Sequence, residues 1–156
     1  MIETPVILTV PSRLAAAIHV TIPRNEIQAV MGPTLKEVMA VAQSQAGGPA
    51  GPWFTHHLQM DPQVFDFEVC VPVAATITGT GRVVCREFPA LSAVRTTYQG
   101  PYEGLGSAWG EFGNWISTQG QVTAPDLYEC YLVGPESGLD SSQWRTELTR
   151  PLVSQP

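Results

Sequence analysis

Hydrophobic and polar positions alternate along several short stretches of the chain, and this alternation predicts β-strands. Turn signals built from Pro, Gly and Asp separate the runs, which cover residues 6–10, 14–22, 53–60, 65–71, 83–88, 91–98, 127–133 and 144–152. Two other segments repeat apolar residues at helical spacing: Leu35, Val38, Met39 and Ala42, and then Leu105, Ala108, Trp109, Phe112 and Ile116. The pattern predicts an α+β fold.

Capping and turn residues suggest where the two helices begin and end. Thr34 and Glu37 have the spacing of a capping box directly after Gly32-Pro33, which predicts a first helix from Thr34 to about Gln45. Gly100-Pro101 predicts the start of the second helix, because proline suits the first helical turn, and Gly120 predicts its end.

The two halves of the chain repeat one order of elements: strand, helix, strand, strand, with one further strand in front. Gly32-Pro33 corresponds to Gly100-Pro101, and the Glu-x-x-x-Pro segment 68–72 corresponds to 147–151. We therefore expect a single domain over residues 1–156, made of repeat one at about 6–75 and repeat two at about 82–153. Duplicated β-α-β-β units with pseudo-twofold symmetry would form an antiparallel sheet with two helices on one face and a central ligand cleft.

Glu129 is the unusual residue of the strand that ends at Gly134-Pro135. Leu127 and Tyr131 flank it on its own face of the strand. It is either a carboxylate in an apolar recess or a polar residue at an edge or solvated face with internal hydrogen bonds. A buried carboxylate is costly unless it is paired, so a buried Glu129 would require a partner, and a cationic ligand is one such partner.

Composition and charge limit the classes of partner. The chain has 156 residues, of which 44% are hydrophobic and 14% are charged, with a net charge of −6. Its eight Lys and Arg are scattered and form no basic stripe, so we expect no direct nucleic-acid binding. An acidic protein favours neutral or cationic small partners.

The sequence favours no metal, cofactor or membrane segment. Cys70, Cys85 and Cys130 lack metal-ligand or disulfide-framework spacing, so they are expected to be free, mostly buried thiols. The adjacent His56 and His57 have no supporting motif for haem. No apolar run approaches the roughly 18 residues of a membrane helix, and the first ten residues do not resemble a signal peptide. We expect a cytoplasmic protein.

Three segments of the second half carry a family resemblance: Pro89-Ala-Leu-Ser-Ala-Val94, Gly100-Pro-Tyr-Glu-Gly-Leu-Gly-Ser-Ala-Trp109 and Tyr128-Glu-Cys-Tyr-Leu-Val-Gly-Pro135. They resemble the GyrI-like small-molecule-binding family. This family includes effector-binding domains of AraC-type and MerR-type multidrug-sensing regulators and stand-alone proteins such as the DNA gyrase inhibitory protein. The resemblance implies the duplicated fold described above, with an architecture related to haem-associated SOUL-like proteins. Because no helix-turn-helix segment accompanies the domain, it also implies a stand-alone member.

The resemblance also implies a ligand site around Glu129, at the floor of an aromatic pocket that binds lipophilic cations. The residues expected to line this pocket with Glu129 are Tyr131, Trp144, Trp109, Trp53, Phe65, His57 and Tyr102. Trp109 also has the spacing of an ordinary core residue. The first half has Thr34-Leu35 where the second has Tyr102-Glu103, so ligand specificity does not carry over from the family.

Two functions follow, from different classes. One is a binding protein for amphipathic, often cationic aromatic molecules, and we favour it. The other is a hydrolase of cyclopropane-bearing alkylating natural products, for self-protection or detoxification, with Glu129 as the general acid or base. No Ser-His-Asp, Cys-His or metal signature competes with Glu129. Exposed strand edges leave a homodimer possible, and a protein partner such as DNA gyrase is not favoured.

Overall fold

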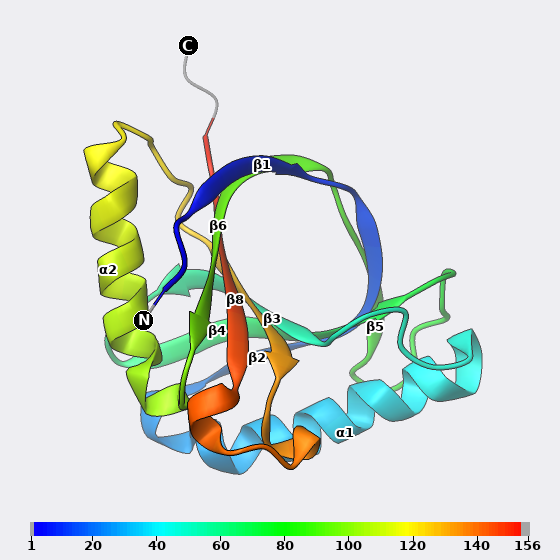
Figure 1. Ribbon diagram of the computed structural model, residues 1–156. Helices are drawn as coiled ribbons and strands as arrows, with labels where there is room; N and C mark the ends of the chain where they lie inside the picture. Colours follow the sequence, from blue (N-terminus) through cyan, green and yellow to red (C-terminus); the bar gives the residue numbers. More distant parts are fainter. Residues whose placement is uncertain (1, 154–156) are drawn as a thin grey trace. The chain divides into compact units, whose positions relative to one another are not determined.

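The computed structural model describes residues 2–153, apart from the side chain of Met60. Its strands are β1 (Val6–Val10), β2 (Arg13–Pro23), β3 (Phe54–Met60), β4 (Val64–Val73), β5 (Val84–Phe88), β6 (Leu91–Gln99), β7 (Leu127–Val133) and β8 (Arg145–Pro151) (Figure 1). The helices are α1 (Ile27–Ala46) and α2 (Leu105–Thr118), and the short 3₁₀ turns are η1 (Arg24–Glu26), η2 (Tyr102–Gly104), η3 (Pro135–Ser137) and η4 (Ser141–Gln143). These elements fall into two compact units. The continuous unit runs from Pro11 to Ala90, and the split unit joins the residues up to Val10 to those from Leu91 onward.

The continuous unit is a four-stranded antiparallel sheet in the order β3-β4-β2-β5, with α1 on one face. Val38 and Ala42 of α1 pack against Phe67, Val69 and Val71 of β4, all of them fully buried. The alternation of residues along β4 places this apolar row on one face and Glu68 and Cys70 on the other.

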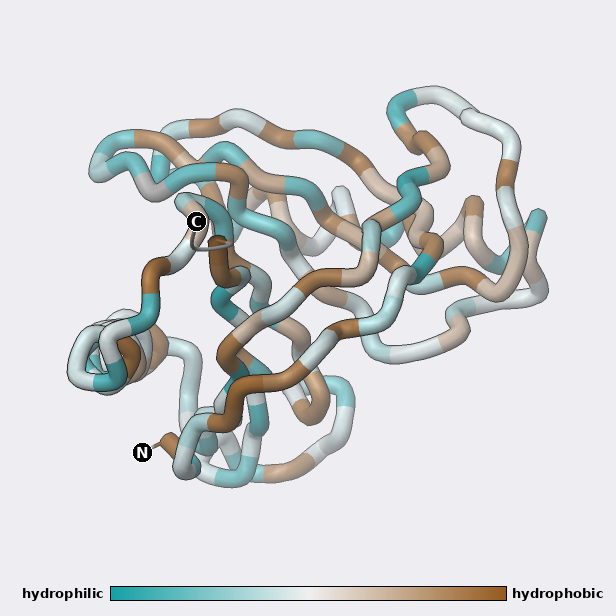
Figure 2. Tube along the Cα trace, turned by 90° about the horizontal axis from the view of Figure 1, so that it is seen from above, coloured by the Kyte–Doolittle hydropathy of each residue, from teal (hydrophilic) through white to brown (hydrophobic). Residues whose placement is uncertain are grey.

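The split unit has the same design, with strand order β1-β6-β8-β7 and α2 on one face. Ala108, Phe112 and Ile116 of α2 pack against Val94 of β6 and Leu148 of β8. Hydrophobic and hydrophilic residues alternate along the strands, as the colours in Figure 2 show. The predicted α+β fold with antiparallel strands is therefore confirmed.

The strand in front of each repeat pairs with a strand of the other repeat. β1 pairs with β6, which places Val6 opposite Arg95. β5 pairs with β2, which places Phe88 opposite Arg13. The compact units consequently begin and end at different residues from the sequence repeats. That the whole chain is a single domain stays a prediction.

The predicted start of the first helix is wrong. Helix α1 begins at Ile27 and carries Pro33 inside it, and Thr34, the expected capping residue, is only 2% exposed in the helix interior. The missing N–H of Pro33 would leave the carbonyl of Ala29 unsatisfied, but both residues are exposed and water can bond that carbonyl. Three apolar residues at helical spacing lie on the N-terminal side of the proline and pack against the core, so burial outweighs the break: Ile27, Val30 and Met31.

Two of the three cysteines are buried, as the sequence analysis expected. Cys70 and Cys130 are buried, Cys85 is partly exposed, and the three form no disulfide. None of the helices in residues 2–153 has the length and apolar character needed to span a membrane.

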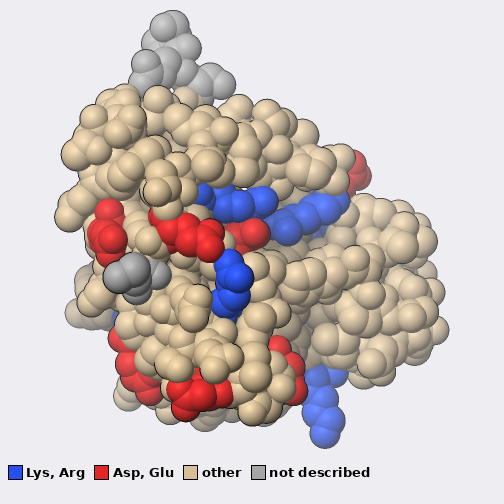
Figure 3. All heavy atoms as spheres, in the orientation of Figure 1, with Lys and Arg blue, Asp and Glu red and all other residues tan. Residues whose placement is uncertain are grey.

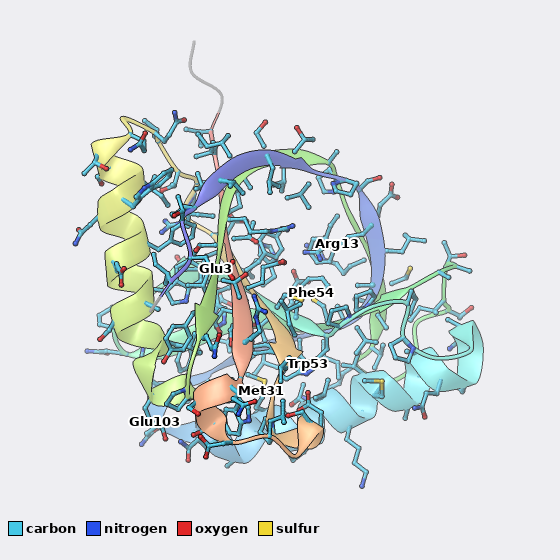
Figure 4. The ribbon with its side chains drawn as sticks, in the orientation of Figure 1. Glu3, Arg13, Met31, Trp53, Phe54 and Glu103 are labelled. Carbon is cyan, nitrogen blue, oxygen red and sulfur yellow. The ribbon has the colours of Figure 1, made fainter. Side chains whose placement is uncertain are left out.

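A buried ionic network lies on the face of the continuous unit opposite α1. The carboxylate of Glu68 accepts hydrogen bonds from Arg86 Nε at 2.7 Å and Arg86 Nη2 at 3.0 Å, and its Oε1 lies 2.9 Å from His56 Nδ1. Burial alone would raise the pKa of Glu68, but the His56 and Arg86 hydrogen bonds outweigh it and lower that pKa to about 2. Nearby, Arg13 stacks on Phe54 at 3.8 Å from the ring centre (Figure 4).

The split unit has a weaker ionic pair at the matching position. Glu147, the repeat equivalent of Glu68, approaches Arg95 Nε at 3.4 Å, and both side chains are partly exposed. Arg145 and Glu3 form another exposed pair at 2.9 Å. Figure 3 shows basic atoms next to acidic atoms on the face it presents.

The turn between β6 and α2 packs tightly over Tyr98. The Tyr98 hydroxyl donates a hydrogen bond to the carbonyl of Pro101 at 2.8 Å. A Cβ at Gly100 would lie 2.6 Å from this hydroxyl oxygen, and a Cβ at Gly104 would overlap it. Gly100 also has φ of 144°, which favours glycine. The two glycines of the Gly100-Pro-Tyr-Glu-Gly104 segment are therefore required by the position of Tyr98.

Gly104→Ala should lower the free energy of unfolding by about 1–3 kcal/mol, because Tyr98 or the turn must move. Gly106→Ala is the matched control: a Cβ there meets nothing within 4 Å, so the same change on α2 should raise stability by about 0.5–1 kcal/mol. Urea denaturation measures both. Adding Tyr98→Phe to Gly104→Ala should recover part of the loss, and equal stability of the two alanine variants would contradict the packing argument.

Glu68→Gln should lower the free energy of unfolding at neutral pH by about 2 kcal/mol, because it removes a buried, hydrogen-bonded charge. The pKa of Glu68 is lowered on folding, so its contribution is present above its ordinary value of 4.5 and is lost as the pH falls toward about 2. The difference between wild type and variant should fade over that pH range. Glu147→Gln, the control, should cost less than about 1 kcal/mol. Equal losses in the two variants would argue against the buried network.

Candidate functional site

Strand β7 places Glu129 on the face of the split unit that α2 covers. Glu129 lies opposite Leu148 of β8, and Tyr131 lies opposite Thr146. Because Leu148 belongs to the core beneath α2, Glu129 and Tyr131 share the apolar face of the sheet. Glu129 is half-buried there and Tyr131 is buried.

Two neutral donors hold the carboxylate of Glu129. The indole Nε1–H of Trp109, from α2, donates to Oε2 at 2.6 Å. The hydroxyl of Tyr131, from the same strand, donates to Oε1 at 2.7 Å. The internal hydrogen bonding considered from the sequence is therefore present. Both of these donors are uncharged groups, and they fix the position of the carboxylate.

Aromatic rings continue from Tyr131 away from Glu129. The ring centre of Tyr102 lies 5.9 Å from that of Tyr131 and 4.9 Å from that of Trp144. Trp144 is fixed by its own Nε1–H, which donates to the carbonyl of Leu139 at 3.2 Å. We call Tyr131, Tyr102 and Trp144 the aromatic row.

The row is positioned by the glycine-rich turn after β6. The backbone N–H of Gly100 donates to the carbonyl of Trp144 at 2.9 Å, which ties this turn to the residue that precedes β8. Tyr102 follows Pro101 in η2, and α2 then continues to Trp109. One turn thus places Tyr102 against Trp144 and begins the helix that brings Trp109 to Glu129.

Glu136 lies beside this row, and the sequence analysis did not identify it. A Cβ added at Gly134 would lie 2.7 Å from the Tyr102 hydroxyl oxygen and 2.9 Å from Glu136 Oε2. Burial raises the pKa of the Tyr102 phenol, and the charges of Glu136 and Glu129 raise it further. Glu136 belongs to an exposed turn, where hydrophobic periodicity carries no signal. The sequence shows only that this acidic residue directly follows the turn residues Gly134-Pro135.

Three other predicted site residues belong to the continuous unit. The His57 ring stacks on Phe67 with ring centres 5.2 Å apart and meets Phe65 edge-on at 5.8 Å. Trp53 is partly buried against the core that includes α1 residues. His56 lies on the opposite face of β3 and bonds Glu68, so only His57 shares the α1 face. That all eight predicted residues line one pocket stays a prediction.

The two repeats place related pairs of side chains at matching positions. Because Glu68 corresponds to Glu147, the registers of β3 with β4 and of β7 with β8 match Thr55 to Glu129 and His57 to Tyr131. Thr55 Oγ1 lies 3.1 Å from His57 Nε2, and Tyr131 donates to Glu129 in the same way across two residues. The carboxylate is therefore a feature of the second repeat alone.

Glu129, its two donors Trp109 and Tyr131, and the aromatic row together form what we call the Glu129 group. Its chemistry suits an organic cation better than a metal ion. Aromatic faces and a carboxylate both attract positive charge, whereas indole N–H and phenol O–H are donors. Within residues 2–153, His, Cys, Asp and Glu side chains form no group of three that could hold a metal ion.

Known structures share this fold. The C-terminal domain of EcmrR is 21% identical, with a TM-score of 0.83 over 97% of this chain and 98% of that domain. In the EcmrR–DNA complex the EcmrR chain is also 21% identical, with a TM-score of 0.84 over 99% of this chain, which spans 58% of that longer protein. SAV2435, whose structure holds tetraphenylphosphonium, is 14% identical with a TM-score of 0.71 over 97% of this chain and 95% of that one.

Sequence comparison gives the family. No curated protein matches the chain. The family described as "GyrI-like small molecule binding domain" matches residues 3–153, which is nearly the whole chain. That match includes both repeats and every residue of the Glu129 group. The chain therefore belongs to the GyrI-like small-molecule-binding family.

Proposed function

We propose that this protein binds lipophilic aromatic cations at Glu129, against the aromatic row. The observation that carries the proposal is the carboxylate of Glu129, which Trp109 and Tyr131 hold at 2.6 and 2.7 Å among aromatic rings. A fixed negative charge in such surroundings attracts a positive charge more strongly than the same group would in water. Each ring face adds roughly 0.5–2 kcal/mol for a cation that has lost its water.

The hydrogen bonds to Glu129 favour cations that donate none themselves. Each of its carboxylate oxygens already accepts one strong hydrogen bond, from Trp109 or from Tyr131. A quaternary phosphonium or ammonium ion needs only charge and ring contact, so it loses nothing at such a carboxylate. The small-molecule role of the family and the tetraphenylphosphonium bound to SAV2435 support this choice of ligand.

The surroundings of Glu129 support the role of a binding residue. Aromatic ring faces attract a cation, and the carboxylate supplies the opposite charge. We therefore assign Glu129 the role of an anchoring charge.

Glu129→Gln should weaken tetraphenylphosphonium binding by about ten- to a hundredfold in isothermal titration calorimetry, because the anchoring charge is lost. Tyr131→Phe keeps the ring and the charge and should change affinity only a few-fold. Glu103→Gln, an exposed neutralisation next to Tyr102, is the control and should bind as wild type does (Figure 4). Equal affinity of wild type and Glu129→Gln would refute the carboxylate-anchor proposal.

A mass-spectrometric time course separates binding from catalysis. We expect a cyclopropane-bearing alkylator incubated with the protein to be recovered at the rate of its spontaneous decay. Faster accumulation of the water adduct with wild type than with Glu129→Gln would instead assign the hydrolase function.

A further inference from the structure

We propose that Glu136 forms a second cation subsite beside Tyr102, so that the protein prefers lipophilic cations carrying an additional hydrogen-bond-donating ammonium group. The inference rests on the proposed function, in which the lipophilic charge occupies the Glu129 site. It goes beyond that function by assigning a second anchoring residue and a narrower class of ligand.

The backbone at Gly134 brings Glu136 to the aromatic row. Strand β7 ends at Val133, and η3 turns the chain directly after Gly134. The Tyr102 hydroxyl oxygen and Glu136 Oε2 both approach the space where a side chain at Gly134 would begin, at 2.7 and 2.9 Å. Because glycine has no Cβ, the phenol oxygen and the carboxylate oxygen can both lie close to the Gly134 backbone and therefore close to each other.

Within residues 2–153, neither of these polar groups is paired: Glu136 forms no ion pair, and the Tyr102 hydroxyl makes no hydrogen bond to another protein group. The arginines of the split unit are engaged elsewhere. Arg95 contacts Glu147 and Thr149, Arg145 pairs with Glu3, and Arg150 donates to backbone carbonyls. A ligand cation at Glu136 would therefore compete with no side-chain cation of this unit.

The aromatic row joins the two carboxylates. Tyr131 donates to Glu129 at one end, and its ring contacts Tyr102, whose hydroxyl lies by Glu136. Burial and both carboxylates raise the pKa of Tyr102, so its phenol stays neutral near pH 7 and keeps its proton to donate. A ligand lying along these rings would meet a negative charge at each end.

The two ends select different kinds of cation. Glu129 already accepts two strong hydrogen bonds, so it suits a charge that donates none. Glu136 is exposed, and water weakens a bare charge–charge attraction there. A primary ammonium can donate one hydrogen bond to the Glu136 carboxylate and its other hydrogen bonds to water, so it suits this exposed end.

Matched ligands test the proposal: butyltriphenylphosphonium and a series of aminoalkyltriphenylphosphonium ions from aminoethyl to aminohexyl. For the best chain length, the amino group should tighten binding by about fivefold in calorimetry, as expected for a partly exposed charged hydrogen bond. Glu136→Gln should abolish this gain and leave butyltriphenylphosphonium affinity within about twofold of wild type. The gain should also shrink as salt is raised.

Two controls separate this inference from the function beneath it. Glu111→Gln, an exposed neutralisation on α2, should preserve both affinities and the gain. Glu129→Gln should weaken both ligands. If Glu129→Gln weakens them but no amino derivative binds more tightly than butyltriphenylphosphonium, or the gain survives in Glu136→Gln, the second subsite is refuted and the proposed function stands. If Glu129→Gln binds both as wild type does, both proposals fail.

Discussion

The close packing of Tyr98 beneath two glycines determines where the other parts of the candidate site lie. Its hydroxyl bonds the carbonyl of Pro101 and leaves room only for hydrogen atoms at Gly100 and Gly104. The turn held in this way carries Tyr102 and begins α2, and its first amide bonds the residue before β8. Aromatic side chains from three separate elements are thereby gathered around one strand. The Gly-Pro-Tyr-Glu-Gly segment is thus required by packing as well as for the placement of Tyr102.

Glu68 in the first repeat and Glu129 in the second have different hydrogen-bond donors. Glu68 accepts bonds from a guanidinium and lies against a histidine, and the hydrogen bonds with His56 and Arg86 lower its pKa despite its burial. Glu129 accepts bonds from an indole and a phenol, which position it without contributing positive charge. The two repeats therefore hold these two glutamates with different kinds of donor: a guanidinium at Glu68, and an indole and a phenol at Glu129.

The sequence predicted the type of nearly every element because alternation and helical spacing follow directly from which face is buried. It misplaced the start of α1 because Gly32-Pro33 looks like a helix boundary, while burial of Ile27, Val30 and Met31 extends the helix through the proline. For Glu129 and Tyr131, strand periodicity was sufficient to place them on one face. Trp109 had the spacing of a core residue, and only the structure shows that its indole edge reaches a carboxylate. Glu136 could not be found, since its position depends on how a turn folds back over Gly134.

Strands β1 and β5, which stand in front of the two repeats, each pair with a strand of the other repeat. This pairing affects how the chain folds as it is synthesised. The continuous unit has its four strands between Pro11 and Ala90, so each of them has a pairing partner within that stretch of the chain. Strand β1 is made first, yet it must wait for β6, because its hydrogen-bonding partner lies beyond the whole of the other unit. Closing so long a loop is slow, and an unpaired apolar strand is prone to pair wrongly in the meantime. Val6 and Ile7, both more than half exposed even in the finished fold, make β1 the segment most in need of protection during synthesis.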